Sequence, residues 1–447
     1  MHVTHQRSFM ALAVSAALLL QTGSAGAIGL QQAYEDALHN DPTYQGAFYD
    51  SESGKEYVNI GRSALLPNLS GDYENNKNRA DIKTLGSGNQ ATLSHPVYDG
   101  EVAMLNLRQP LFSPEAVARY RQGMAQSNYS ARQFEFQGQD LALRVAGAYF
   151  DALFAHDQVL LATAQRDVLV EQRRINDRML ERGEGTKTDM LETQAKLDLA
   201  EAQLIESKDN EVTARDTLAA IVGHQISGLD GLMENLPVKP LEPREFEAWK
   251  TLALDHNSEI AAQRFAIESS AQEIQKDKAG HLPRLDFVAS YGRQNDNSVY
   301  TYNQESLVRS VGIQLTVPLF AGGAVSATTR QAVAANERAK ADLVAKTDKV
   351  LVDLRKQYNL VVSSVGRIEA LHKAVASGEL LIVATEQSIK GGVRINLDLL
   401  SAQQQLYATK KDLAQALYGY LLGTLRLRAG AGVLSSDDVH DLATYFH

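Results

Sequence analysis

The sequence carries the same short proline motif twice. It reads Gln109-Pro110-Leu111-Phe112 in its first half and Val317-Pro318-Leu319-Phe320 in its second half, at an offset of 208 residues (318 − 110). A second pair reads Leu66-Pro67-Asn68-Leu69 and Leu282-Pro283-Arg284-Leu285, at an offset of 216 residues (283 − 67). Motifs that keep their order at a nearly constant offset indicate a duplicated structural unit.

A third pair of landmarks extends the duplication toward the C-terminus. Gly183 is followed by Asp189, and Gly392 is followed by Asp398, at an offset of 209 residues (398 − 189). The pattern predicts two repeats with a short connection rich in proline between them. The expected organisation is a signal peptide, residues 1–27; a first repeat, 28–236; a proline-rich linker, 237–245; a second repeat, 246–430; and a C-terminal tail, 431–447.

The first residues have the features of a secretion signal. A polar, basic start precedes an apolar run over residues 9–20, and Ala25-Gly26-Ala27 is a small-x-small cleavage site. The run is about 12 residues long, whereas a helix that spans a bilayer needs about 20. We therefore expect a mature chain that begins at Ile28 and lies outside the cytoplasm.

The composition excludes several kinds of site. The 447 residues include no cysteine, which rules out disulfides, cysteine-based zinc sites and thiol nucleophiles. The formal net charge of −10 argues against a nucleic-acid partner, because phosphate binding needs a basic surface. Residues 183–188 lack the glycine before the lysine that a phosphate-binding loop requires, and no other catalytic motif occurs. We expect no enzyme activity and no cofactor.

Two proline-free stretches, residues 115–236 and 319–447, predict very long helices, because proline disrupts a helix interior. In each stretch apolar residues step alternately by three and four, which is typical of a coiled-coil seam. Each helix of about 65 residues would be about 100 Å long, and a shorter helix would follow it, with tips at Gly183, Gly391 and Gly392. The seam residues are Leu141, Val145, Ala148, Ala152, Ala155, Val159 and Ala162 in the first repeat, and Leu351, Leu354, Tyr358, Val361, Val365, Ile368, His372 and Val375 in the second.

The segments bracketed by proline predict four β-strands. Apolar and polar residues alternate over residues 103–109, 285–292 and 311–319, and more weakly over 69–75. Strands in outer-membrane barrels alternate in this way, and so do half-buried strands in soluble sheets. We favour the barrel because the chain has a signal peptide and no cysteine for a lipid anchor. The predicted strand–helix corners are Pro67, Pro110, Pro283 and Pro318.

Four strands are too few to close a barrel. Open sheet edges are not tolerated in lipid, and bacterial barrels begin at about 8 strands. Because a barrel of 8 strands encloses little more than side chains, a conduit needs at least three chains. We predict a mainly α-helical protein with a β part, in which a homotrimer builds a 12-stranded barrel continued by a helical tunnel.

The duplication, the paired proline corners and the Gly-x5-Asp tips resemble the outer-membrane efflux protein family, the TolC-like channels. Residues 107–115 and 34–42 are most similar to the branch that serves type I secretion. The resemblance implies a trimeric channel-tunnel in the outer membrane of a Gram-negative bacterium, extending into the periplasm. It also implies contact with outer-membrane lipid, a periplasmic adaptor (membrane fusion) protein and an inner-membrane ABC transporter, and export of a polypeptide or of small molecules.

In this family the coiled-coil tips form a periplasmic gate. By alignment on Gly183, Thr188 and Asp189 match gate positions of the first repeat. By alignment on Gly392, Arg394 matches the gate arginine and Asp398 matches an aspartate of an acidic ring. The resemblance therefore implies that a bond between Arg394 and Asp189 holds the gate shut, although both aspartates would also suit the first turn of an ordinary helix.

Two positions depart from the family's gate pattern. Ile389 stands where the type member has a latch tyrosine, and Ser401 stands where it has a second ring aspartate. The hydroxyl latch of the family is therefore not expected in this chain. A multidrug efflux duct and, as a different class, a soluble periplasmic adaptor with a coiled-coil hairpin are the alternatives left open by the sequence.

Overall fold

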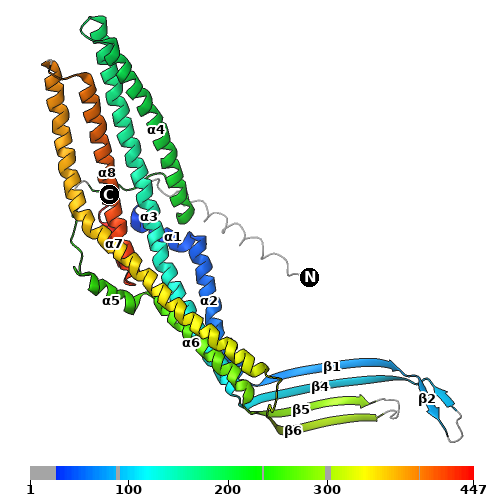
Figure 1. Cartoon of the computed structure of the whole chain (residues 1–447). Helices are drawn as coiled ribbons and strands as arrows, with labels where there is room; N and C mark the ends of the chain where they lie inside the picture. Colours follow the sequence, from blue (N-terminus) through cyan, green and yellow to red (C-terminus); the bar gives the residue numbers. More distant parts are fainter. Residues whose placement is uncertain (1–26, 87–90, 234–235, 297–303, 392) are drawn as a thin grey trace, which may run out of the picture. The chain divides into compact units, whose positions relative to one another are not determined.

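The computed structural model describes residues 27–86, 91–233, 236–296, 304–391 and 393–447 (Figure 1). The predicted signal peptide and Gly392 therefore lie essentially outside the described residues. The chain forms two compact units, each of which combines segments of both repeats. The helical unit contains residues up to 45, 138–252 and 352–447, and the sheet unit contains residues 46–137 and 253–351.

The sheet unit is built around four antiparallel strands in the order β1-β4-β5-β6 (Figure 1). The first hairpin of the sheet comes from the first repeat and the second from the second repeat, and β4 pairs with β5 to join them. A separate two-stranded sheet, β2 with β3, lies between β1 and β4 in the chain. The strands are β1 (Asn68–Arg79), β2 (Ile82–Leu85), β3 (Ala91–Ser94), β4 (Val97–Phe112), β5 (Arg284–Asp296) and β6 (Gln304–Thr316).

The four strands have one apolar face and one mainly polar face. The register pairs Leu105 with Tyr291 and Ala289 with Val311, so that odd-numbered residues share one face across all four strands. Large apolar side chains on this face are exposed in the single chain: Leu69, Tyr73, Leu105, Tyr291, Leu307, Val311, Ile313 and Leu315. The opposite face carries Ser70, Asp72, Asn106, Arg108, Asp286, Ser290, Ser310 and Gln314.

A charged cluster on the polar face links the two repeats. Asp286 of β5 is fully buried, and its Oδ2 atom lies 2.6 Å from Nη2 of Arg108 on β4 and 3.0 Å from Nε of Arg284. A buried carboxylate is tolerated when it is paired in this way. The cluster therefore fixes the pairing between the strands of the two repeats.

The four predicted corner prolines all lie at or near strand ends. Pro67 and Pro283 immediately precede β1 and β5, and Pro318 lies between β6 and the next helix. Pro110 lies inside β4, where the register with β5 shifts between Pro110 and Phe112. Proline cannot donate a hydrogen bond to a strand ladder, which confines it to strand ends, edges and bulges.

Helices of the sheet unit pack beside these corners through small residues. Gly61 and Gly123 lie at a close crossing of two helices, where a Cβ on Gly123 would come within 2.3 Å of the Tyr57 carbonyl oxygen. The helices are α2 (Pro42–Ser63), α6 (Ser258–Lys278), the 3-10 helix η1 (Ala279–His281), and the first parts of α3 (Pro114–Glu181) and α7 (Ala324–Lys390).

The helical unit consists mainly of two helical hairpins that lie side by side (Figure 1). The first pairs α3 with α4 (Lys187–Val222), and the second pairs α7 with α8 (Asn396–Gly430). The two long helices have 68 and 67 residues, which confirms the predicted length. In the described residues, no helix combines the length and apolarity needed to cross a membrane.

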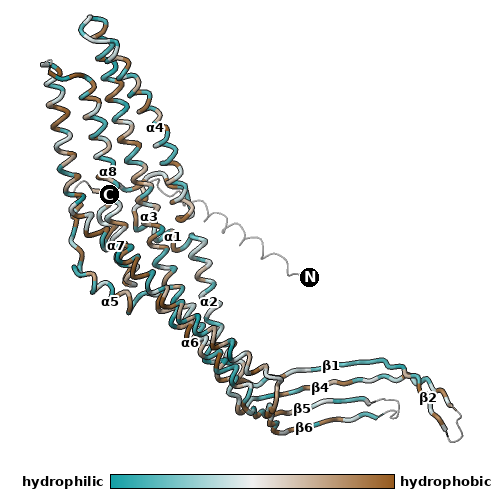
Figure 2. Tube along the Cα trace, viewed as in Figure 1, coloured by the Kyte–Doolittle hydropathy of each residue, from teal (hydrophilic) through white to brown (hydrophobic). Residues whose placement is uncertain are grey.

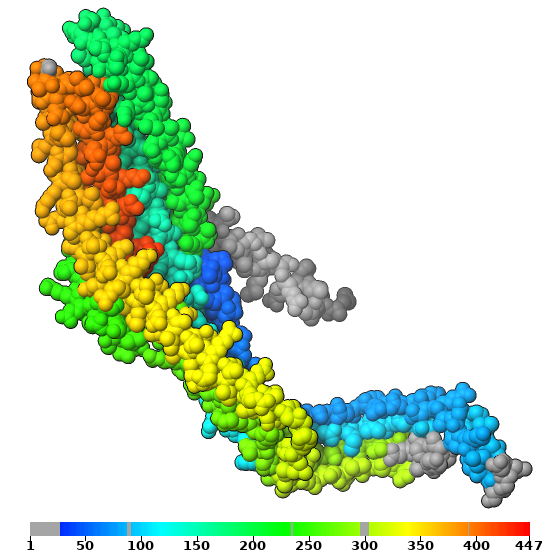
Figure 3. Space-filling view, viewed as in Figure 1, coloured from blue at the N-terminus to red at the C-terminus, as the bar shows by residue number. Residues whose placement is uncertain are grey.

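The predicted seams are largely buried. Leu141, Val145 and Ala152 of α3 are buried, as are Leu354, Val361 and Ile368 of α7. The seam prediction was wrong for His372, which is exposed, whereas the neighbouring Leu371 packs against the core in its place. In Figure 3, α8 lies between α7 and the α3–α4 pair, consistent with the buried residues that follow its length.

The C-terminal tail is part of the core of the helical unit. Phe446 is buried with its ring centroid 5.6 Å from those of Tyr149 and Phe150. The backbone of His447 exchanges two hydrogen bonds with Gly231, each 3.0 Å long. The tail contains α9 (Ser436–Ala443), and the remaining helices of this unit are α1 (Leu30–Asn40) and α5 (Phe246–His256).

Candidate functional site

The tip of the first hairpin is a tight turn that caps the following helix. Gly183 adopts a left-handed conformation with φ of 76°, which glycine adopts without strain. Thr186 then caps α4: its hydroxyl accepts a hydrogen bond from the Asp189 backbone N–H at 3.1 Å and donates to Asp189 Oδ2 at 2.6 Å. The neighbouring Thr188 is exposed. The Asp189 side chain thus acts locally, in the first turn of its own helix.

The tip of the second hairpin is less tightly capped. Gly391 follows the end of α7, and Ile395 precedes α8 without a side-chain capping bond. Arg394 is exposed, and Asp398 lies in the first turn of α8. Among the described residues, no ion pair or hydrogen bond joins Arg394 to Asp189. The single chain therefore does not bring together the pair expected from the sequence.

A ring of four uncharged side chains connects the two hairpins instead. Gln172 Nε2 of α3 donates to Asn396 Oδ1 of α8 at 2.9 Å and to Asn176 Oδ1 at 3.2 Å. Asn396 Nδ2 and Asn176 Nδ2 both donate to Thr193 Oγ1 of α4, at 3.1 and 2.8 Å. These four bonds close a ring, which we call the amide–threonine ring. It was not predicted from the sequence.

An apolar cluster lies beside the amide–threonine ring. Leu169 of α3, Leu197 and Ala200 of α4, and Leu400 of α8 are buried together. Their contact packs Leu400 of the second hairpin against side chains of the first. Figure 2 shows hydrophobic positions interspersed with hydrophilic ones along these four helices. The cluster accounts for part of the packing between the hairpins.

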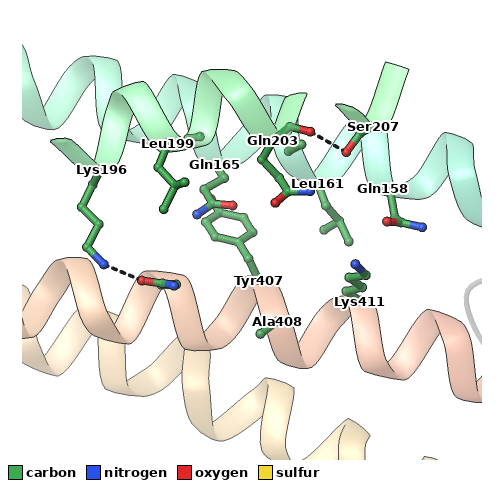
Figure 4. Close-up of a pocket in the computed structure, with 13 residues that line it drawn as sticks. Gln158, Leu161, Gln165, Lys196, Leu199, Gln203, Ser207, Tyr407, Ala408 and Lys411 are labelled. Carbon is green, nitrogen blue, oxygen red and sulfur yellow. Dashed lines mark hydrogen bonds between the residues drawn. The ribbon is translucent and has the colours of Figure 1, made fainter. Parts of the chain in front are cut away.

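An open groove continues between the hairpins beyond this cluster (Figure 4). Lys196 Nζ of α4 donates to Gln404 Oε1 of α8 at 2.7 Å across one end of it. Tyr407 projects from α8 toward α3 and α4 (Figure 4), and its burial, together with the nearby carboxylate of Asp167, raises the pKa of its phenol. The groove is lined by Gln158, Leu161, Ala162, Gln165, Lys196, Leu199, Ala200, Gln203, Ser207, Gln404, Tyr407, Ala408 and Lys411.

The described side chains near the tips form hydrogen bonds and apolar contacts between the hairpins. In the parts of the chain that the structure describes, no group of three or more His, Asp or Glu side chains could hold a metal ion. The site is a junction between two helical hairpins, held by hydrogen bonds and by apolar packing.

Comparison with known proteins identifies the architecture. The sequence model of the outer membrane efflux protein family matches residues 33–224 and 249–433, one segment for each repeat. The chain belongs to the outer membrane efflux protein family. It is thus an outer-membrane channel protein that extends into the periplasm, which confirms the predicted family and location.

Two relatives resemble this outer membrane efflux protein along nearly its whole length. The alkaline protease secretion protein AprF of Pseudomonas aeruginosa is 42% identical over 98% of this chain and 92% of its own. The proteases secretion protein PrtF of Dickeya chrysanthemi is 39% identical over 98% of this chain and 95% of its own. Both are secretion proteins by name.

A solved structure shares the fold of this outer membrane efflux protein. The CmeC outer membrane channel of Campylobacter jejuni superposes with a TM-score of 0.78, covering 94% of this chain and 90% of that chain, at 15% identity. The likeness concerns the fold alone. It agrees with the predicted combination of a barrel-forming sheet and long helical hairpins.

The amide–threonine ring could have been found by a closer inspection of the seams. Leu169 and Asn176 continue the seam of α3, and Thr193 begins the buried row of α4 that includes Leu197 and Ala200. A polar residue at a seam position specifies register in a coiled coil at a cost in stability. Polar residues inside an apolar seam were therefore the available signal.

Proposed function

We propose that three copies of this chain form the exit duct of a type I secretion system that exports a polypeptide across the outer membrane. The observation that carries this proposal is the similarity to AprF and PrtF over 98% of the chain, because both are named for the secretion of proteases. The duct works with an inner-membrane ABC transporter and a periplasmic adaptor, and it transports its cargo without a cofactor.

The sheet supports the trimeric arrangement. In the described sheet, β1 and β6 are the edge strands, each paired on one side. Lipid does not tolerate an open edge, so each edge must pair with a strand of another copy. Three sheets of four strands close a barrel of 12 strands, in which the apolar face contacts lipid and the polar face lines the pore.

The groove between the hairpins supports an adaptor contact. It runs between α4 and α8, and Lys196 and Lys411 lie among its lining residues while no acidic residue does. A helix of the adaptor that carries carboxylates would be complementary to this lining. Binding there would act directly on the junction between the hairpins.

The residues matched by the family's gate pattern would surround the periplasmic mouth. In the trimer, Thr188 and Asp189 of the first tip and Arg394 and Asp398 of the second would hold the mouth closed and line it with carboxylates. Exposed Arg394, which has no ion-pair partner among the described residues of its own chain, supports a bond to a neighbouring copy. Rings of aspartates favour cations.

Deletion of the gene in its own host tests the function. We expect the exported polypeptide to disappear from the medium and to remain in the cells, and the full chain to restore export. The matched control is a chain without residues 1–27, which should not restore it. Unchanged export together with increased sensitivity to toxic small molecules would contradict the proposal and assign the duct to multidrug efflux.

A further inference from the structure

We infer that the amide–threonine ring is the latch that holds the second helical hairpin against the first within one chain, with Thr193 as its positioning residue. The inference rests on the proposed function, because a latch matters only if the hairpins separate to open the duct. The ring joins α3 and α4 of the first repeat to the start of α8 in the second.

Every hydrogen-bonding position of the Thr193 hydroxyl is used. A hydroxyl has one donor and two acceptor positions. Thr193 Oγ1 donates to the Asp189 carbonyl oxygen at 2.8 Å and accepts from Asn176 and Asn396. Because the side chain is fully buried, with 0% exposed, water cannot replace a lost donor while the hairpins remain in contact. The site therefore favours the closed arrangement in which Asn396 is present.

The same contacts provide hydrogen-bond partners for the other side chains of the amide–threonine ring. Asn396 uses its amide group toward Thr193 and its carbonyl group toward Gln172. Asn176, with 6% exposed, also donates to the Asp189 carbonyl oxygen at 3.3 Å. A fully satisfied buried network specifies one arrangement, whereas a partly satisfied one is costly. Withdrawal of Asn396 alone would remove one bond that Thr193 accepts and one bond that Gln172 donates.

The four side chains are uncharged, which distinguishes the ring from an ionic latch. Salt screens interactions between exposed charges and has little effect on neutral hydrogen bonds. Arg394, in contrast, is exposed at the tip. We therefore expect the closure provided by the ring to persist at an ionic strength that weakens any closure provided by Arg394.

The decisive variant is Thr193→Val in the full-length trimer, which removes the hydroxyl and keeps the branched shape. We expect single-channel conductance in planar bilayers to rise about two-fold or more, because the open population grows. Thr193→Ser keeps the hydroxyl and should retain the wild-type conductance. Thr213→Val is the matched control, since Thr213 makes the same bond to the carbonyl four residues earlier on α4 but is exposed. Asn396→Ala breaks the ring from the second hairpin and should repeat the Thr193→Val result.

A cross-link gives a readout that a general loss of stability would not produce. The chain has no cysteine, so cysteines placed at Lys196 and Gln404, whose side chains touch across the hairpins, react alone with a short bismaleimide. The intrachain link should return Thr193→Val to the wild-type conductance. An assembled Thr193→Val trimer with wild-type conductance would overturn the latch.

The same cross-link separates failure of the latch from failure of the proposed function. If the wild-type trimer forms no pore, the proposed function as a duct is refuted. The latch role of the amide–threonine ring is then tested by the yield of the intrachain link, measured by mass spectrometry. A lower yield in Thr193→Val than in Thr193→Ser supports the ring as the junction between the hairpins. Equal yields in the two variants overturn it.

Discussion

Threonine side chains at the hairpin tips perform two different tasks, and the difference is visible only at the scale of single residues. Thr186 caps its own helix through Asp189 and is exposed. Thr193, two turns further along α4, is buried and reaches the other repeat through Asn396. Replacing Thr186 by alanine should therefore destabilise the start of α4 by about 0.5–2 kcal/mol, the usual cost of losing an N-cap side chain. Replacing Thr193 should affect the association of the hairpins.

Arg394→Ala tests the gate role that the family pattern implies. We expect a larger single-channel conductance in planar bilayers, because the loss of an ion pair to Asp189 would loosen the mouth in all three copies. Each exposed pair contributes only about 0–1 kcal/mol, so the increase should shrink at high salt. Lys390→Ala is the matched control, since it removes the same charge from the exposed end of α7. Unchanged conductance in Arg394→Ala would refute the gate role.

Asp157→Asn tests a half-buried carboxyl in the helical unit. Burial raises the pKa of Asp157 above its ordinary value, although the hydrogen bond from Tyr418 at 2.8 Å and the nearby His156 oppose the increase. The folded state then binds the proton more tightly than the unfolded state. Stability from this group is therefore greatest below the ordinary pKa of about 3.9 and is lost as the pH rises through the folded pKa.

The expected result is a higher unfolding temperature for Asp157→Asn than for the wild type at pH 7, measured by circular dichroism. The Tyr418 hydroxyl can still donate to the new amide oxygen, so only the cost of the buried charge is removed. The difference should become smaller as the pH falls toward 4. Asp198→Asn, which removes a charge from an exposed position of α4, should change little at either pH. A lower unfolding temperature for Asp157→Asn at pH 7 would contradict the argument.

At the scale of elements, the helices were predictable because their signals are local. Proline is absent from α3 after Pro114 and from all of α7, and the repeat of three and four residues marks a seam in each, so that helix length and hairpin topology followed from the sequence. The amide–threonine ring did not, because it depends on which seam residues of different helices meet at one level. Asn396 and Thr193 are far apart in the chain, and their contact is set by tertiary packing.

The strands were predicted less evenly. Alternation is clear in β4, β5 and β6, whereas β1 is largely hydrophilic (Figure 2) and gave the weakest signal. The segment between β1 and β4 contains the β2–β3 hairpin, which was not predicted from the sequence. Strand β6 ends at Thr316, before the alternation ends, because the proline at 318 cannot continue a ladder.

The role of the C-terminal tail was not predictable from the sequence, and a substitution at Phe446 tests how much the tail stabilises the helical unit. Phe446→Ala should lower the stability of the helical unit by about 3–5 kcal/mol, the usual cost of removing a buried aromatic side chain. Phe446 is buried against Tyr149 and Phe150. Thermal unfolding measures the loss, and Phe446→Leu should lose less because it fills more of the cavity. Equal unfolding temperatures for Phe446→Ala and the wild type would show that the tail is dispensable.

At the scale of the whole molecule, the two faces of the sheet explain why one chain is insufficient. A large apolar face on a soluble monomer would drive association, and β1 and β6 leave unpaired backbone groups at both edges. Membrane insertion covers the face, and pairing with neighbouring copies covers the edges. The same duplicated unit that gives each chain two helical hairpins also gives it two strand pairs, so assembly completes the barrel and the tunnel together.

The register of β6 allows the lipid-facing side of the sheet to be tested with adjacent residues. Val311 lies on the apolar face and is 74% exposed in the single chain, whereas Ser310 lies on the polar face. Val311→Lys would place a charge in the bilayer at a cost of about 2–4 kcal/mol per copy near the midplane, and this cost adds over the three copies of one barrel. We expect a lower yield of trimer in the outer-membrane fraction, measured by fractionation and gel electrophoresis without boiling. Ser310→Lys adds the same charge one residue away, where it faces water in the pore, and should assemble as the wild type does. If the two variants assemble equally well, the assignment of the faces is contradicted. If Ser310→Lys alone is defective, the assignment is reversed, and with it the side of the sheet that the cargo contacts.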